Sequence, residues 1–261
     1  METAEFTGFR VDAEGVRGNI VLSRPDRLNP LSTETLLDLE TAARWFDARP
    51  DVRVVVVSGE GRAFSAGADL VSFTPGGMGD RPPHEAADAG RRMADALESM
   101  RAIGIARIHG HCVGGGLVLA AACDLRVASS DTRFSIPEID LGIPLAWGGI
   151  PRLVREIGPA LTKELVMTCR PFDADEAKAA GFLNRVVDLD DLDSAVEELA
   201  DAIASRPAFA VQATKSATNA VTSQMVGTAR AWADSQALMA GLHDPEGRQS
   251  AENYLAKVRK K

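Results

Sequence analysis

Short β-branched runs alternate with longer helical patterns through the first 190 residues of the chain. Residues 9–22 predict two strands around a Glu-Gly turn, and the run VRVVVV at 52–57 predicts a strand that is buried on both faces. Between them, Ser32 is expected to cap an amphipathic helix that ends near Ala48. Later segments predict strands at 103–108 and 124–129, helices at 91–100 and from about 147, and an N-capped helix followed by a strand within 173–188. This alternation is typical of an α/β fold.

The pattern changes near residue 190, because every periodic segment beyond Leu189 is helical. Helices are predicted at 191–205, 207–222, 225–241 and 246–259. We therefore divide the chain into an α/β core region, 1–190, and an all-helical region, 191–261.

A glycine-rich stretch after the predicted strand at 103–108 is the strongest local signal for a binding site. Residues 110–116 end in three consecutive glycines, and the apolar run LVLAAAC follows from Leu117. Glycines leave backbone N–H groups uncovered, and the start of a helix favours negative charge. Because the run has no polar face, we expect a short helix that is buried inside the fold.

A second candidate segment, AFSAGADL at 63–70, follows the predicted strand at 52–57. Its small residues at 66–68 allow a ligand to approach the backbone closely. Residues 73–90 come next and are rich in Gly and Pro without periodicity, so a loop is expected there.

Composition limits the classes of partner. The chain has 261 residues, 45% of them hydrophobic, and a formal net charge of −8, which is the profile of a globular protein large enough to bury a core. A negatively charged chain has no electrostatic reason to bind nucleic acid or an anionic membrane. Three widely spaced cysteines, no signal segment and no long apolar run indicate a reduced, cytoplasmic protein.

The two glycine-containing turns and one carboxylate together indicate chemistry next to a carbonyl group. One backbone N–H from each turn, aimed at the same oxygen, would stabilise the enolate that forms when a neighbouring carbon loses a proton. Glu138 is a lone carboxylate in the apolar loop FSIPEIDLGIP. Desolvation there is expected to raise its pKa and to suit it for proton transfer near neutral pH.

Two other features carry weaker signals. His109 and His111 form an H-x-H pair without a third ligand, so no metal site is expected. Cys112 lies beside the glycine stretch but has no obvious base partner, which favours a packing role.

Several segments together resemble the crotonase superfamily, the enoyl-CoA hydratases and isomerases. In chain order they are IVLSRPDRLNPLS, AFSAGADL, HGHCVGGGLVLAAACDLRVAS, FSIPEIDLGIP, DADEAKAAGFLNRVV and EGRQSA. The resemblance implies a right-handed spiral of ββα units, a C-terminal helical region, and assembly as a homotrimer or a dimer of trimers. It also implies an acyl-CoA thioester as the substrate and no separate cofactor, because coenzyme A is part of the substrate.

The resemblance assigns roles to individual residues. The backbone N–H groups of Ala68 and Gly115 are expected to hold the thioester oxygen, and Glu138 is expected to move the proton. Further substrate contacts are assigned to Ala66, Asp69 and Leu70 beside the adenine of CoA, to Arg27 and Leu28 beside its pantetheine and phosphates, and to Gly114. Trp147 either shapes the acyl end of the pocket or fills the core. Lys257 or Arg259 is expected to replace a CoA contact that many relatives make near the C-terminus.

Two departures from the family pattern favour one reaction. Hydratases of this family use two glutamates, but Val118 occupies the first of those positions here, and a valine neither orients water nor accepts a proton. Similar isomerases work with the second glutamate alone, and the further aspartate of dienoyl isomerases is Ala146 here. The sequence therefore favours an enoyl-CoA isomerase. Two alternatives stay open: a catalytically silent acyl-CoA-binding homologue, and a hydratase whose second acid is Asp140, His111, Glu85 or Asp88.

Overall fold

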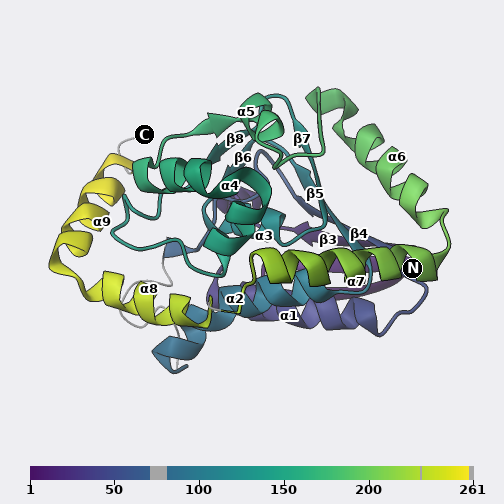
Figure 1. Ribbon diagram of the computed structural model, residues 1–261, viewed down its shortest axis with the longest axis horizontal. Coiled ribbons are helices and arrows are strands. Elements are labelled where there is room, and N and C mark those ends of the chain that lie inside the picture. The colour runs from purple at the N-terminus through teal and green to yellow at the C-terminus, as the bar shows by residue number, and fades with distance from the viewer. Residues whose placement is uncertain (71–80, 230, 259–261) are drawn as a thin grey trace.

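A parallel sheet covered by helices on both faces forms the centre of the molecule (Figure 1). The computed structural model describes residues 1–70, 81–229 and 231–258. Within these ranges seven strands form the main sheet, in the order β1-β2-β3-β4-β5-β7-β10. Neighbours from β1 to β3 are antiparallel, and neighbours from β3 to β10 are parallel. The predicted α/β class is confirmed.

The strands of the main sheet include all those that the hydrophobic pattern predicts. They are β1 (Glu2–Phe6), β2 (Phe9–Glu14), β3 (Arg17–Leu22), β4 (Val54–Gly59), β5 (Ile103–Ile108), β7 (Leu125–Ser129) and β10 (Arg185–Val187). A smaller sheet joins three very short strands, β6 (His111–Val113), β8 (Arg133–Ser135) and β9 (Phe172–Asp173).

Helices surround these strands. They are α1 (Thr33–Asp47), α2 (Pro83–Ser99), α3 (Gly115–Ala121), α4 (Gly149–Thr168), α5 (Ala174–Ala179), α6 (Leu192–Ala204), α7 (Ala208–Met225), α8 (Asp234–His243) and α9 (Pro245–Val258). Ser32 caps α1 as predicted, since its side chain accepts a hydrogen bond from the Thr35 N–H.

Strand β4 shows why a run of valines belongs in this sheet. Val55 and Val57 pack into the core that includes residues of α1, α2 and α3, whereas Val54 and Val56 pack against α6 on the opposite face. Successive side chains of a strand point to opposite faces, so a strand covered on both sides is apolar throughout. The boundary that we predict near residue 190 stays a prediction, and α6 beyond it packs directly on the sheet.

The prediction of a loop at 73–90 is wrong for residues 83–90, which are helical. Residues 71–80 lie outside the described ranges, but α2 begins at Pro83, eight residues before the predicted start of that helix. Proline is well suited to the first turn of a helix, where its missing N–H is no loss. Gly90 lies inside α2, where a Cβ would come within 2.1 Å of the Trp147 ring, so packing rather than chain reversal explains this glycine.

The C-terminal helices lie at two ends of the molecule. Figure 1 shows α6 at one end and α8 with α9 at the other. Helix α8 contacts α2 as well as α9. A search of the described helices finds none that is both long and apolar enough to cross a membrane.

Candidate active site

The glycine-rich stretch forms the turn that enters the buried helix α3. Gly114 has φ +49°, a backbone conformation that side chains rarely adopt, and a Cβ there would lie 2.5 Å from Oε1 of Glu138. Its N–H donates to the Ser135 carbonyl at 2.9 Å, which ties the turn to β8. Every residue of α3 is buried, so the predicted buried helix is confirmed.

The segment 63–70 forms the second turn, and five of its eight backbone N–H groups have an acceptor in the described chain. The amides of Ser65, Ala66 and Asp69 donate to backbone carbonyls, and that of Gly67 donates to the Ser65 hydroxyl at 3.1 Å. Among the described residues the amides of Ala68 and Gly115 find no acceptor. An unpaired backbone N–H is uncommon away from water, and two in one place indicate a ligand oxygen.

The two turns touch at Gly67. This residue has φ +89°, and a Cβ there would lie 2.5 Å from the Val113 carbonyl oxygen and 3.1 Å from the backbone nitrogen of Gly115. Only glycine allows so close an approach between the two backbones. The free amide of Gly115 is therefore directly beside the turn that carries the free amide of Ala68.

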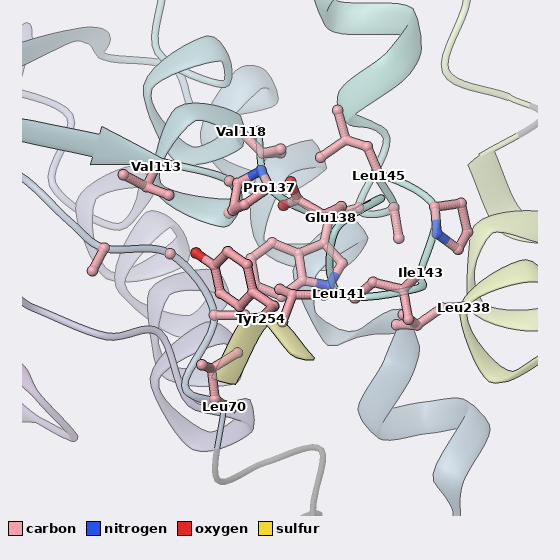
Figure 2. A pocket seen from close by; sticks show the side chains of 18 residues that line it. Leu70, Val113, Val118, Pro137, Glu138, Leu141, Ile143, Leu145, Leu238 and Tyr254 are labelled. Carbon is pink, nitrogen blue, oxygen red and sulfur yellow. The ribbon is translucent and has the colours of Figure 1, made fainter. Parts of the chain in front are cut away.

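Both turns open on a cavity of about 90 Å³ whose walls are mostly apolar (Figure 2). Its lining includes small residues of the two turns, the loop that carries Glu138, and side chains of α8 and α9. The lining residues are Ala66, Gly67, Ala68, Leu70, Val113, Gly114, Gly115, Val118, Pro137, Glu138, Leu141, Ile143, Pro144, Leu145, Ala146, Trp147, Leu238 and Tyr254.

Glu138 is the lone carboxylate among the described residues of this lining. The residue as a whole is partly accessible, but its Oε2 is buried and has no hydrogen-bond partner in the described chain. Burial away from water raises the pKa of Glu138 to about 7, and only its own backbone N–H opposes this effect. A carboxyl group with that pKa both accepts and releases a proton near neutral pH.

The loop around Glu138 is held by its own backbone and by α9. The amides of Leu141 and Ile143 both donate to the Glu138 carbonyl, at 3.1 and 3.0 Å. On the outer side, the Ser250 hydroxyl of α9 donates to the Asp140 carbonyl at 3.0 Å. These contacts fix the backbone that carries the Glu138 side chain, which Figure 2 shows between Val118 and Tyr254.

Most of the site residues predicted from the sequence line this cavity. Arg27, Leu28 and Asp69 do not line it. The residues that line it are Ala66, Ala68, Leu70, Gly114, Gly115, Glu138 and Trp147. Asp69 is buried and paired with Arg27, at 3.0 Å between Nη2 and Oδ1, so it faces the neighbouring loop. Leu28 lies in the same loop, where its carbonyl accepts the Ala66 N–H at 2.8 Å. Arg259 lies outside the described residues, and Lys257 is exposed on α9.

The relocated acids that the sequence leaves open are all absent from the described lining. Val118 does line the cavity, at the position where hydratases of the family carry a glutamate. Asp140, His111 and Glu85 are exposed, and Asp88 pairs with Arg91 on α2. None of these four side chains lines the cavity with Glu138.

Tyr254 is the lining residue that sequence reasoning missed. It is the one tyrosine of the chain, it lies on α9, and it adds a hydroxyl group to the otherwise apolar wall. Burial, followed by the nearby Asp140 and Glu138 carboxylates, raises the pKa of Tyr254, so the phenol stays neutral. Helical periodicity reveals which face of α9 is apolar but not that α9 folds back over the site, so no sequence signal indicated this contact.

The polar groups near the cavity have structural roles. His109 is buried, with Nε2 at 2.8 Å from the Gly61 carbonyl oxygen and Nδ1 at 3.1 Å from Arg107, and burial lowers its pKa. Across the described chain, no three His, Cys, Asp or Glu side chains lie close enough together to hold a metal ion. Burial raises the pKa of the Cys112 thiol, which makes it a poor nucleophile.

Comparison with known proteins decides the family. The family model described as "Enoyl-CoA hydratase/isomerase" matches residues 13–261. The chain belongs to the enoyl-CoA hydratase/isomerase family. Its resemblance to the crotonase superfamily is thereby confirmed, and the fold is the crotonase fold.

Individual relatives carry both activities in their names. The chain is 34% identical to the crotonyl-CoA hydratase of Syntrophomonas wolfei, over 77% of this chain and 76% of that protein. It is 35% identical to a peroxisomal Δ(3,5)-Δ(2,4)-dienoyl-CoA isomerase of Arabidopsis thaliana, over 76% and 75% of the two chains.

Solved structures agree with the fold. An enoyl-CoA hydratase from Mycobacterium avium subsp. paratuberculosis K-10 superposes with a TM-score of 0.87 at 25% identity, covering 95% of this chain and 99% of the other. A protein of the enoyl-CoA hydratase type from Thermobifida fusca YX, solved in complex with acetoacetyl-CoA, gives a TM-score of 0.76 at 28% identity and covers 97% and 96%.

Proposed function

We propose that this protein is an enoyl-CoA isomerase in which Glu138 moves one proton along the acyl chain. The observation that carries the proposal is the buried carboxyl group of Glu138, which has a pKa of about 7 and is the lone carboxylate among the described residues that line this apolar cavity. Val118 lines the same cavity at the position where the resemblance places the second carboxylate of hydratases. One carboxylate that both accepts and returns a proton is sufficient for isomerisation, whereas the two-glutamate hydration mechanism lacks one group here.

The reaction balances without any added cofactor. Glu138 takes the proton from C2 of a 3-enoyl-CoA, and the electron pair of that C–H bond passes into the thioester to give a dienolate. The protonated Glu138 then delivers the proton to C4, which leaves the double bond between C2 and C3. Coenzyme A enters and leaves as part of the substrate, so no separate cofactor is required.

The amides of Ala68 and Gly115 hold the negative oxygen of the dienolate in this proposal. Support comes from their unpaired N–H groups and from the contact between their two turns at Gly67. Loss of one such donor typically costs about 3–4 kcal/mol of transition-state stabilisation. Gly114, Ala66 and Leu70 line the same cavity, and the resemblance assigns the last two to the adenine of CoA.

In this proposal the outer part of CoA extends past the loop that carries Arg27 and Leu28 and past Asp69 in the adjoining turn. Arg27 is about half exposed, with 47% of its side chain accessible, and it is anchored by Asp69 beneath it. An anchored guanidinium at the surface suits a phosphate group.

Hydration is the second candidate, because the Syntrophomonas wolfei relative is named a hydratase and because Tyr254 adds a hydroxyl group to the cavity. A neutral phenol can donate a hydrogen bond to a water molecule while Glu138 accepts its proton. The two candidates therefore differ in what Tyr254 contributes.

We also propose that the protein assembles as a homotrimer or a dimer of trimers in the cytoplasm. Helix α7 has no buried residue among those described, and its Phe209 and Met225 are 84% and 77% exposed. Large exposed apolar side chains on one helix are typical of an oligomer contact. Native mass spectrometry measures this assembly directly.

Parallel assays with two substrates test the function. With a 3-enoyl-CoA, the wild-type protein is expected to form the conjugated 2-enoyl thioester, and Glu138→Gln is expected to lose this activity by a factor of about 10² to 10⁴. With a 2-enoyl-CoA, the conjugated absorbance is expected to persist. Loss of that absorbance in a Glu138-dependent manner would establish the hydratase instead, and equal inactivity of wild type and variant in both assays, with acyl-CoA still bound, would establish the silent homologue.

A further inference from the structure

The Trp147 side chain lies between α3 and α2, at the wall of the candidate site. It lines the cavity, yet it is only 8% exposed, and its backbone has φ +61°. A bulky residue in the left-handed region is a genuine outlier, and such a conformation persists only where the surrounding structure holds it. The surrounding structure must therefore hold this residue in place.

Two glycines make room for the indole ring. A Cβ on Gly115 would lie 2.2 Å from Cζ3 of Trp147, and a Cβ on Gly90 of α2 would lie 2.1 Å from its Cδ2. The ring therefore lies directly against the backbone that carries the proposed oxyanion donor and against α2 beyond it. Because side chains are missing at both contacts, the ring fills the space between α3 and α2 that would otherwise extend the cavity.

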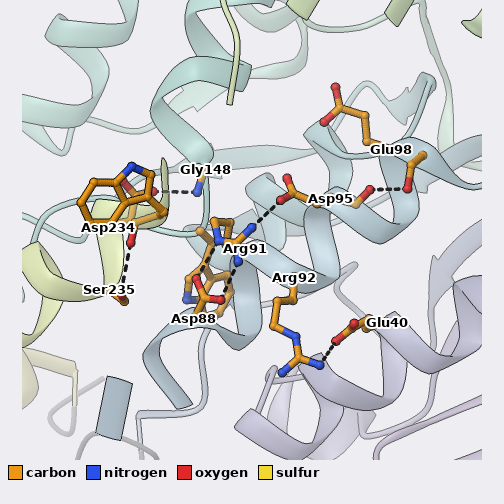
Figure 3. Close-up of polar contacts among 12 residues, drawn as sticks. Glu40, Asp88, Arg91, Arg92, Asp95, Glu98, Gly148, Asp234 and Ser235 are labelled. Carbon is orange, nitrogen blue, oxygen red and sulfur yellow. Dashed lines mark hydrogen bonds and ion pairs between the residues drawn. The ribbon is translucent and has the colours of Figure 1, made fainter. Parts of the chain in front are cut away.

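Polar contacts lock the turn that carries Trp147 (Figure 3). The N–H of Gly148 donates to Oδ2 of Asp234 on α8 at 2.8 Å. The buried Arg152 donates to the Gly148 carbonyl at 3.2 Å and pairs with Asp95 of α2 at 2.8 Å. Helices on both sides thus fix the backbone on which the ring is mounted, which makes Trp147 a rigid wall.

The small volume of the cavity is consistent with an acyl end that Trp147 closes. Its volume of about 90 Å³ is well below the roughly 300–1,000 Å³ that is typical of pockets for drug-sized ligands. The sulfur, the carbonyl group and the next three carbons of a four-carbon acyl thioester already amount to about six atoms. Little space is left for a longer chain while the indole is present.

We propose that Trp147 closes the acyl end of this cavity and restricts the protein to CoA thioesters of short acyl chains, of about four to six carbons. This inference rests on the proposed function only in taking an acyl-CoA as the ligand. It names a substrate class for the same site, whatever reaction Glu138 performs there.

Binding of saturated thioesters tests the inference without requiring turnover. Butyryl-CoA, octanoyl-CoA and dodecanoyl-CoA have no double bond to move, so isothermal titration reports binding alone. The wild-type protein is expected to bind butyryl-CoA at least about tenfold more tightly than octanoyl-CoA. Trp147→Ala is expected to improve octanoyl-CoA binding by about tenfold or more and to leave butyryl-CoA within a few-fold of its original affinity.

A second variant is expected to move the Trp147 ring further into the cavity. Gly90→Ala places a methyl group against the ring and is expected to drive the indole into the cavity, which weakens butyryl-CoA binding by about tenfold. In the double variant Trp147→Ala with Gly90→Ala the clash is absent, so the affinities are expected to return to those of Trp147→Ala. Trp147→Phe, a milder change, is expected to lengthen the accepted chain by fewer carbons, and Trp232→Ala is the matched control, since Trp232 is 60% exposed and outside the lining.

The outcomes separate this inference from the proposed function. Equal affinity of the wild-type protein for butyryl-CoA and octanoyl-CoA, or an unchanged ratio in Trp147→Ala and Trp147→Phe, would overturn the role of Trp147. A clear length preference without isomerisation would leave the inference standing and refute the proposed reaction. Binding of none of the three thioesters would refute both.

Discussion

The raised pKa of Glu138 makes a quantitative prediction about stability. Between an ordinary value of 4.5 and about 7, at about 1.4 kcal/mol for each pH unit, the difference amounts to about 3 kcal/mol. Below pH 4.5 both the folded and the unfolded chain hold the proton, so the group has no effect. As the pH rises towards 7, the unfolded chain ionises first, and the folded state loses stability until Glu138 itself ionises.

Glu138→Gln removes this titration while keeping the shape of the side chain. The free energy of unfolding of the variant, minus that of the wild-type protein, is expected to grow by about 3 kcal/mol between pH 4.5 and pH 8. Urea unfolding at a series of pH values and one fixed protein concentration measures it. Glu14→Gln is the matched control, because Glu14 is an exposed glutamate at the end of β2. A flat or falling difference for Glu138→Gln would refute the desolvated carboxyl group.

Three further variants test the rest of the site and its support. Val118→Glu restores the missing family carboxylate beside Glu138 and is expected to confer hydration of 2-enoyl-CoA, seen as loss of conjugated absorbance, at a cost in thermal stability because α3 is buried. Tyr254→Phe is expected to keep isomerisation within about tenfold of wild type, whereas a fall of about 100-fold or more would show that the phenol takes part in the chemistry. Glu98 of α2 pairs with Arg152 and with Arg155 of α4, each at 2.5 Å. Burial alone would raise the pKa of Glu98, but these two arginines lower it, so Glu98→Gln should cost about 2 kcal/mol at pH 7. That difference, measured by urea unfolding, should shrink as the pH falls below 4.5 and wild-type Glu98 takes up its proton; a gap that widens in acid would contradict the ion pairs.

The sequence predicts the parts of this fold that depend on local pattern. The valines of β4 and the uniformly apolar α3 are buried as their composition predicts, and the Ser32 cap begins α1. The meeting of the turns at 63–70 and 110–116 follows from the family resemblance, since periodicity alone does not indicate that two distant turns touch.

Other features depend on tertiary contacts that no local pattern encodes. Residues 73–90 predicted a loop because they are rich in Gly and Pro without periodicity, but Gly90 lies inside α2, where its missing side chain accommodates Trp147. Strand β9 has two residues, too few for any alternation to be recognised. Tyr254 reaches the cavity because α9 packs on the Glu138 loop, where a Cβ on Gly142 would lie 2.1 Å from the Gly247 carbonyl.

In the proposed isomerisation Glu138 carries the same proton from C2 to C4 of the acyl chain. Conversion of 3-butenoyl-CoA in D₂O, followed by NMR from the first turnovers, tests it most directly. A single buried carboxyl group predicts that a substantial fraction of the 2-butenoyl product retains protium from C2 at C4. One deuterium at C4 in every product molecule from the first turnovers would contradict this transfer, because the delivered hydrogen would then come from solvent or from a second group.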